Sequence, residues 1–158
     1  MLPASLNESY PAVAASVPRA RTAISQFAGA AGAAAEQIEA VRWASSEALT
    51  NVVLHAYGDG DGEIHVTAAV TAGELWVLVA DDGRGLGGHS DNAGLGLGLS
   101  LMAQLTDDLV IARRAGGGTE VRMRFALVPA AAPRGGDQAR GSLACARRPA
   151  SPRFSTTK

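Results

Sequence analysis

Two stretches near the start of the chain carry apolar residues at the spacing of an amphipathic helix. In the range Val17–Ala28, Ile24 and Phe27 fall on one face, and Pro18 suits a first helical turn. In the range Ala34–His55, apolar residues again recur every three or four positions, which predicts a second and longer helix. The apolar positions of this second stretch are Ile38, Val41, Ala48, Leu49, Val52 and Val53.

Strand patterns follow the second helix. Residues 63–70 alternate between polar and apolar, which is typical of a strand with one exposed face. The range Glu74–Ala80 is almost wholly apolar, as in a central strand. A glycine-rich stretch then leads into a short helix predicted over about Gly98–Leu105. The last two strands, Leu109–Arg114 and Thr119–Val128, flank a glycine turn and are predicted to form a hairpin.

This order of elements predicts an α+β fold. Strands joined by short turns pair antiparallel, and helices with one apolar face must cover a sheet. We therefore expect a two-layer sandwich whose sheet is mixed but mostly antiparallel, with the helices on one face. The first ten residues are expected to add an edge strand. Residues 1–128 form the predicted domain, and residues 129–158, rich in Pro, Arg, Gly, Ala and Ser, are predicted to be a disordered basic tail.

Composition narrows the functional classes. The chain has 158 residues, 47% of them hydrophobic, which is enough for one domain with its own core. Residues 1–128 carry eight basic and fourteen acidic side chains, whereas the remainder carries six basic and one acidic. The acidic charge of residues 1–128 argues against direct nucleic-acid binding. The basic tail is interpreted as a solvated segment, which is the usual state of a charged run outside a core.

Neither cysteine content nor hydropathy points to secretion or to a membrane. The single Cys145 excludes an internal disulfide and fits a reducing compartment. The range Met1–Tyr10 has neither the basic region nor the apolar run of a signal peptide. No stretch reaches the roughly 18 apolar residues needed to span a bilayer. We therefore expect a cytoplasmic protein without membrane contact.

The second helix carries a candidate catalytic pair. Glu47 and Asn51 lie four residues apart, so both side chains project from one helix face. A carboxylate there can accept a proton from an incoming nucleophile, and the amide oxygen one turn later can bind magnesium, which prefers hard oxygen ligands. The alternative interpretation is that Glu and Asn are simply solvated on an exposed face.

A second candidate lies where the apolar strand ends. Asp81 follows the strand directly, so its carboxylate is placed to accept a hydrogen bond from an amino group such as that of adenine. Gly83 and Gly85 remove side chains and allow a flat base to approach the backbone. The alternative is an ordinary acidic turn.

The glycine-rich stretch and the final hairpin supply two more candidates. Gly94, Gly96 and Gly98 are predicted to precede the short helix, where bare backbone amides and the helix N-terminus can hold phosphate oxygens. The stretch lacks both the dinucleotide fingerprint and the Gly-Lys-Ser/Thr of a Walker loop. Thr119 follows three glycines, and its hydroxyl could reach a base or a water beside Asp81. The alternatives here are a flexible connector and an ordinary strand residue.

Together these motifs resemble the GHKL superfamily of ATP-binding proteins, which includes gyrase, histidine kinases and MutL. Four boxes correspond in order: Glu47–Asn51, Asp81–Gly85, Gly94–Leu99 and Gly117–Thr119. Within the superfamily, the stretch from Glu47 through Tyr57 and the stretch from Gly96 through Asp107 are most similar to bacterial anti-sigma factor serine kinases.

The resemblance implies a Bergerat-type sandwich that binds ATP and Mg²⁺ at one end. It implies that Glu47 is the general base, Asn51 the magnesium ligand and Asp81 the adenine contact. The backbone from Gly94 to Gly98, with Leu95 and Leu97, would bind phosphates. The implied reaction transfers the γ-phosphoryl group of ATP to a serine of an anti-anti-sigma (STAS-type) partner, which competes with a sigma factor for the kinase. A homodimer is usual in this family.

Two alternatives stay open. The chain could be a non-catalytic ATP-binding regulatory module, or a histidine-kinase-type catalytic domain that acts in trans. One departure bears on the first alternative: the segment between Gly85 and Gly94 is short, lacks a Phe-Asp-Pro-like stretch, and has His89 as its only cationic candidate.

Overall fold

A computed structural model describes residues 5–85 and 95–127 of the chain. In these two ranges the chain forms five β-strands, three α-helices and one π-helical turn, η1. Their bounds are β1 Ser5–Pro11, α1 Ser16–Ala30, α2 Ala35–Asn51, η1 Val52–Ala56, β2 Glu63–Thr71, β3 Glu74–Asp81, α3 Leu95–Leu105, β4 Asp108–Arg113 and β5 Thr119–Ala126.

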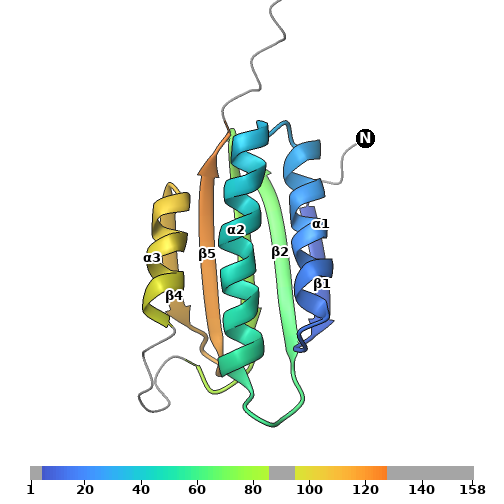
Figure 1. Ribbon diagram of the computed structural model, residues 1–158, viewed down its shortest axis with the longest axis vertical. Coiled ribbons are helices and arrows are strands. Elements are labelled where there is room, and N and C mark those ends of the chain that lie inside the picture. The colour runs from blue at the N-terminus through green and yellow to red at the C-terminus, as the bar shows by residue number, and fades with distance from the viewer. Residues whose placement is uncertain (1–4, 86–94, 128–158) are drawn as a thin grey trace, which may run out of the picture.

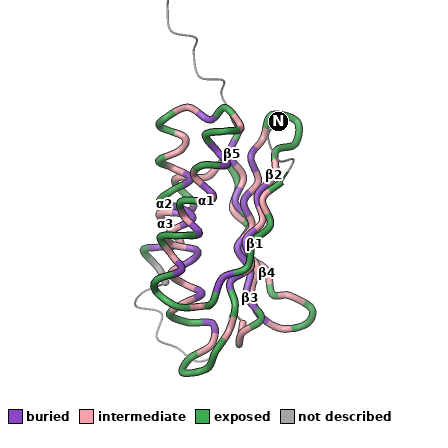
Figure 2. Tube along the Cα trace, turned by 90° about the vertical axis from the view of Figure 1, so that its right-hand side faces the viewer, coloured by how far each residue is buried: buried purple, intermediate pink, exposed green. Residues whose placement is uncertain are grey.

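The strands form one sheet in the order β1-β2-β3-β5-β4. All four strand pairs are antiparallel, including β3 with β5, which are separated in sequence by α3 and β4. The helices lie on one face of this sheet, as Figures 1 and 2 show. The predicted α+β sandwich is therefore confirmed, and so is the edge strand expected within the first ten residues.

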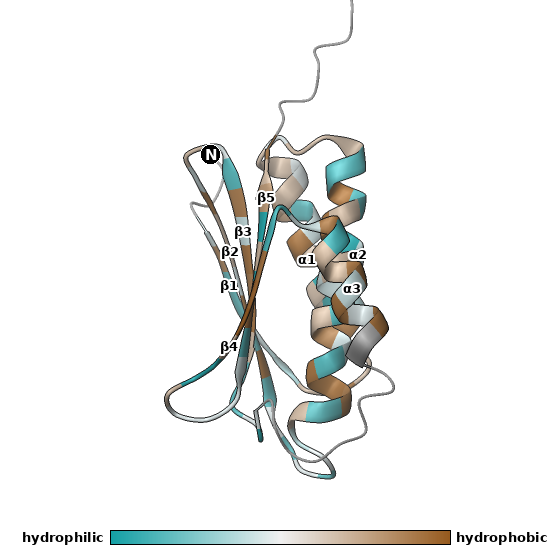
Figure 3. Ribbon diagram, turned by 90° about the vertical axis from the view of Figure 1, so that its left-hand side faces the viewer, coloured by the Kyte–Doolittle hydropathy of each residue, from teal (hydrophilic) through white to brown (hydrophobic). Residues whose placement is uncertain are grey.

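Apolar side chains fill the space between the helices and the sheet. Every second residue of the central strands points toward the helices, where α1 and α2 supply many alanines, so the two layers approach closely. Figure 3 shows the helices and the sheet as two layers side by side, with apolar residues in the elements of both. Fully buried members of this core include Ile24, Val41, Leu49, Ile64, Leu75, Val77, Met102 and Met123.

Two helix boundaries differ from the prediction. The second predicted helix ends as an α-helix at Asn51 and continues for one turn as η1. The last helix begins at Leu95, so the prediction that Gly96 and Gly98 precede it is wrong. Glycine is a poor helix former, but Gly98 is buried against α2, and this packing overrides its propensity.

The antiparallel arrangement gathers four chain segments at one end of the molecule. Figure 1 shows the end of α2 with η1, the end of β3, the start of α3 and the start of β5 at its lower end. Residues 128–158 lie outside the described ranges, so the basic tail stays a prediction. In the described ranges, no helix has both the length and the apolar character needed to cross a membrane.

Candidate functional site

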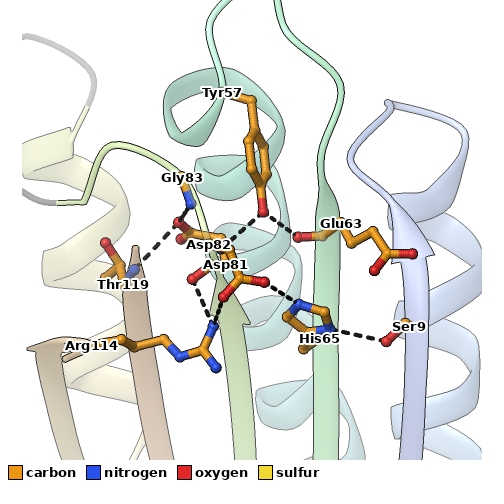
Figure 4. Close-up of polar contacts among 9 residues, drawn as sticks. All are labelled: Ser9, Tyr57, Glu63, His65, Asp81, Asp82, Gly83, Arg114 and Thr119. Carbon is orange, nitrogen blue, oxygen red and sulfur yellow. Dashed lines mark hydrogen bonds and ion pairs between the residues drawn. The ribbon is translucent and has the colours of Figure 1, made fainter. Parts of the chain in front are cut away.

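Asp81, the last residue of β3, is a buried carboxylate at the centre of this end. Its side chain is on the helix-facing side of the strand and only 4% exposed. One carboxylate oxygen, Oδ1, accepts hydrogen bonds from the backbone N–H of Gly83 at 2.9 Å and of Thr119 at 3.3 Å (Figure 4). The carboxylate therefore joins the first glycine box to the last one.

The glycines around Asp81 are required by close contacts within the protein. A Cβ on Gly83 would lie 2.1 Å from the carbonyl oxygen of Ala56, and a Cβ on Gly118 would lie 1.9 Å from that of Asp81. Gly85 has φ of 71°, a left-handed conformation that favours glycine. Gly83 thus has a steric role within the protein, because it lets the segment after β3 pack against η1. Its expected role in admitting a flat base stays a prediction.

The Glu47 side chain lies against α3. Its side chain is half-buried on α2, and a Cβ on Gly98 would lie 2.6 Å from its Oε2 atom. The carboxylate therefore lies directly over the first turn of α3. The first four N–H groups of an α-helix have no partner within the helix, so this turn offers donors beside the Glu47 carboxylate.

The remaining predicted residues lie near this end or outside the described ranges. Asn51 is the last residue of α2 and is half-buried. Leu95 and Gly96 begin α3, and Leu97 is 83% exposed on it. Gly94 and His89 lie outside the described residues. The structure thus brings Glu47, Asp81, Gly83, Gly85, Gly98 and Thr119 to one end of the sandwich.

A polar network that the sequence did not predict lies on the opposite, outer face of the sheet. Asp82 projects there and is bonded through Oδ2 to Nε2 of His65 at 2.7 Å, and through Oδ1 to Nη1 of Arg114. His65 Nδ1 in turn lies 2.9 Å from the Ser9 hydroxyl. The doubled aspartate was the only signal in the sequence, because the partners come from β1, β2 and the β4–β5 turn (Figure 4).

This network changes the protonation behaviour of Asp82. The hydrogen bond from His65, with the nearby Arg114 guanidinium, lowers the pKa of Asp82 below its ordinary value. Asp82 therefore stays ionised on the outer face, directly beside the buried Asp81.

Comparison with known proteins matches this arrangement to one family. The family description "Histidine kinase-like ATPase domain" matches residues 10–125, which include all four boxes. The chain belongs to the histidine kinase-like ATPase family. The resemblance to GHKL proteins inferred from the four boxes is thereby confirmed.

Similar proteins fall in the anti-sigma branch of this family. An anti-sigma F factor of Clostridium acetobutylicum is 29% identical over 69% of this chain and 85% of its own length. The serine-protein kinase RsbW of Bacillus licheniformis is 35% identical over 56% of this chain and 66% of its own. A solved structure of the RsbU and RsbW domains of a Mycobacterium tuberculosis protein is 25% identical with a TM-score of 0.62, and covers 80% of this chain and 33% of that one.

The donor set suits a nucleotide whose metal is held mainly by phosphates. Among residues 5–85 and 95–127, no three His, Cys, Asp or Glu side chains are grouped as a metal site. Mg²⁺ usually keeps several waters and binds through one or two protein oxygens plus substrate phosphates, so Asn51 alone is compatible with it. A buried carboxylate between two glycine segments likewise fits an exocyclic amino group.

Proposed function

We propose that the protein is an ATP-dependent serine kinase and anti-sigma factor. Its substrate would be a serine of an anti-anti-sigma partner with a STAS-type fold, and its second partner a sigma factor. The observation that carries the proposal is the Asp81 carboxylate, buried and bonded to Gly83 and Thr119, at the same end as Glu47 over α3. The names of the similar proteins support the choice of substrate and partners.

Each residue has a proposed role. Asp81 accepts a hydrogen bond from the adenine amino group, and Thr119 lies beside it to contact the base directly or through water. Asn51 supplies one oxygen ligand to Mg²⁺, and the backbone of Gly94 to Gly98 donates to phosphate oxygens. Bound Mg-ATP supplies the γ-phosphoryl group and most of the charge neutralisation.

Glu47 acts as the general base. It accepts the proton of the incoming serine hydroxyl while that oxygen attacks phosphorus, and ADP leaves. The base is held over the first turn of α3, so it lies beside the N–H donors expected to face phosphate. We further propose that the protein is cytoplasmic and acts as a homodimer, as implied by its resemblance to this family.

The test is phosphoryl transfer from labelled ATP to a small STAS-type protein with a phosphorylatable serine. Glu47→Ala is expected to bind Mg-ATP with unchanged affinity and to lose at least about 100-fold in transfer, since general bases contribute roughly that much or more. Glu39→Ala, on the same helix and ion-paired with Arg42, is the control and should retain transfer. Unaltered transfer by Glu47→Ala would end its assignment as the base.

A further inference from the structure

The peptide bond that follows Asp81 is held at both of its polar atoms. Its carbonyl oxygen, which belongs to Asp81, accepts a hydrogen bond from Nη1 of Arg114 at 2.9 Å. Its N–H, which belongs to Asp82, donates to the phenol oxygen of Tyr57 at 2.9 Å. Both partners are side chains. Ala80 is the last residue of β3 that pairs with β5, so this peptide lies beyond the end of that strand pairing. We call Arg114 and Tyr57 the peptide clamp.

Further hydrogen bonds hold the two side chains of the peptide clamp in place. Arg114 also binds the carboxylate of Asp82, which His65 holds from the other side. Tyr57 donates its own proton to the carbonyl oxygen of Glu63 at 2.7 Å. Figure 4 shows these residues arriving around a single peptide from β2, from the position just after η1, and from the β4–β5 turn. Rotation of that peptide would break contacts on both sides.

This peptide anchors the stretch of backbone that carries the Asp81 side chain. Holding it fixes the position of the Asp81 Cα–Cβ bond relative to the sheet, which is the base from which the carboxylate reaches its partners. The same carboxylate then meets the N–H groups of Gly83 and Thr119. A displacement of about 1 Å in a positioned group can cost roughly 100-fold in a reaction or a large share of a binding preference.

We propose that Arg114 and Tyr57 are positioning residues for base recognition: they act through the Asp81 peptide and determine the preference for adenine. This inference rests on the proposed nucleotide site. Both residues act through the backbone: Arg114 lies on the outer face of the sheet with Asp82, and the Tyr57 hydroxyl bonds to the N–H of Asp82 and the carbonyl oxygen of Glu63. The clamp should therefore matter only for bases that use the Asp81 carboxylate.

The chain offers a matched control at the other end of β3. Arg124 is also an outer-face arginine that binds a carboxylate of β3, Glu74 at 2.7 Å, and a backbone carbonyl, that of Asp107 at 3.4 Å. The two arginine side chains are similarly exposed, at 28% for Arg124 and 35% for Arg114, although Glu74 is less exposed than Asp82. The two arginines differ in which end of the strand they hold.

The experiment measures affinity for Mg-ADP and Mg-IDP by calorimetry on the full chain. IDP carries a carbonyl in place of the 6-amino group of adenine, so its 6-position cannot donate a hydrogen bond to Asp81. The wild type is expected to prefer ADP. Arg114→Met should reduce the ADP:IDP affinity ratio about 10-fold by weakening ADP alone, and Arg124→Met should leave the ratio unchanged. Thermal melts of both variants monitor the fold.

Tyr57→Phe keeps the ring and removes only the hydroxyl, so it tests the clamp if Arg114→Met does not fold. It should reduce the ratio by about threefold or more. An unchanged ratio in a folded variant, or equal losses for ADP and IDP, would overturn the positioning role. If the wild type binds neither nucleotide, the proposed function fails and this inference fails with it.

Discussion

Strand β3 has an acidic residue and an arginine partner at each end, yet the two ends are built differently. At its start, the turn before Glu74 contains Gly73, and a Cβ there would meet nothing within 4 Å. At its other end, a Cβ on Gly83 or Gly118 would collide with a backbone oxygen. One glycine is needed for its backbone conformation alone, while the others are needed because chain segments touch.

The difference shows where contacts between chain segments, rather than turn geometry, require glycine. An ordinary hairpin turn needs only a residue that tolerates positive φ, as Ala72 with φ of 53° demonstrates beside Gly73. The far end instead packs η1, the β4–β5 turn and the residues after β3 against one another. This crowding buries the Asp81 carboxylate and orients it, which a freely hinged loop would not do.

The largest expected effect is a difference in stability between the alanine variants of Gly118 and Gly73. Both have left-handed φ, 85° and 79°, so alanine meets the same backbone strain of about 1 kcal/mol at either position. Only at Gly118 would the added Cβ lie 1.9 Å from the Asp81 oxygen. We expect Gly118→Ala to lose at least about 3 kcal/mol in the free energy of unfolding, measured by urea titration. Equal losses in the two variants would contradict the close packing.

The second prediction is a loss of activity without a loss of stability. At Gly98 an added Cβ would meet the end of the flexible Glu47 side chain rather than backbone. Gly98→Ala should therefore keep or gain up to about 1 kcal/mol in stability from helix propensity, while transfer to the partner serine falls roughly 100-fold. Ala103→Gly in the same helix calibrates the propensity term. A destabilised Gly98→Ala protein with normal transfer would be inconsistent with the Glu47 contact.

A smaller effect tests the outer-face network through pH. The pKa of Asp82 is lower in the folded protein than in the unfolded chain, so its stabilisation is present above the ordinary carboxyl pKa and is lost as pH falls through the folded value. Asp82→Asn should destabilise the protein at pH 7 by less than about 1 kcal/mol, because the side chain is 58% exposed. This difference from wild type should shrink below about pH 4. A difference independent of pH would argue against the ionised network.

The smallest effect is expected from removing the residues that follow the last strand. The last described backbone contact, from the N–H of Leu127 to the carbonyl oxygen of Gly73 at 2.8 Å, ties the end of β5 to the β2–β3 turn. A chain ending after residue 130 keeps this contact, so its thermal midpoint should stay within about 2 °C of the full chain. A large loss of cooperativity in the melting curve would refute the predicted boundary near residue 128.

Much of the fold could be read from the sequence because hydrophobic spacing decides which face of each element is buried. The strands alternate or run apolar as the sheet requires. Asp81 was predicted directly after the central strand, and the structure has it as that strand's last residue. The start of α3 was predicted wrongly because glycine disfavours helices, and the contact with Glu47 that favours Gly98 is a tertiary one.

The outer-face network could not be predicted for a related reason. His65, Asp82 and Arg114 meet only because β2 lies beside β3 and β3 beside β5 in one particular register. No local pattern specifies that register across α3 and β4. The proposed roles of Glu47, Asn51 and Asp81 rest on the four boxes and on where the structure places them.

The central claim is that segments distant in sequence converge on one site for a magnesium-bound adenine nucleotide. Calorimetric titration of the full chain with Mg-ADP, side by side with Asp81→Asn, tests it most directly. The account predicts one nucleotide per chain for the wild type and an affinity reduced roughly 10- to 100-fold in the variant, since a hydrogen bond to a charged group is lost. No heat of binding to the folded wild type, or equal affinities for the two proteins, would contradict it.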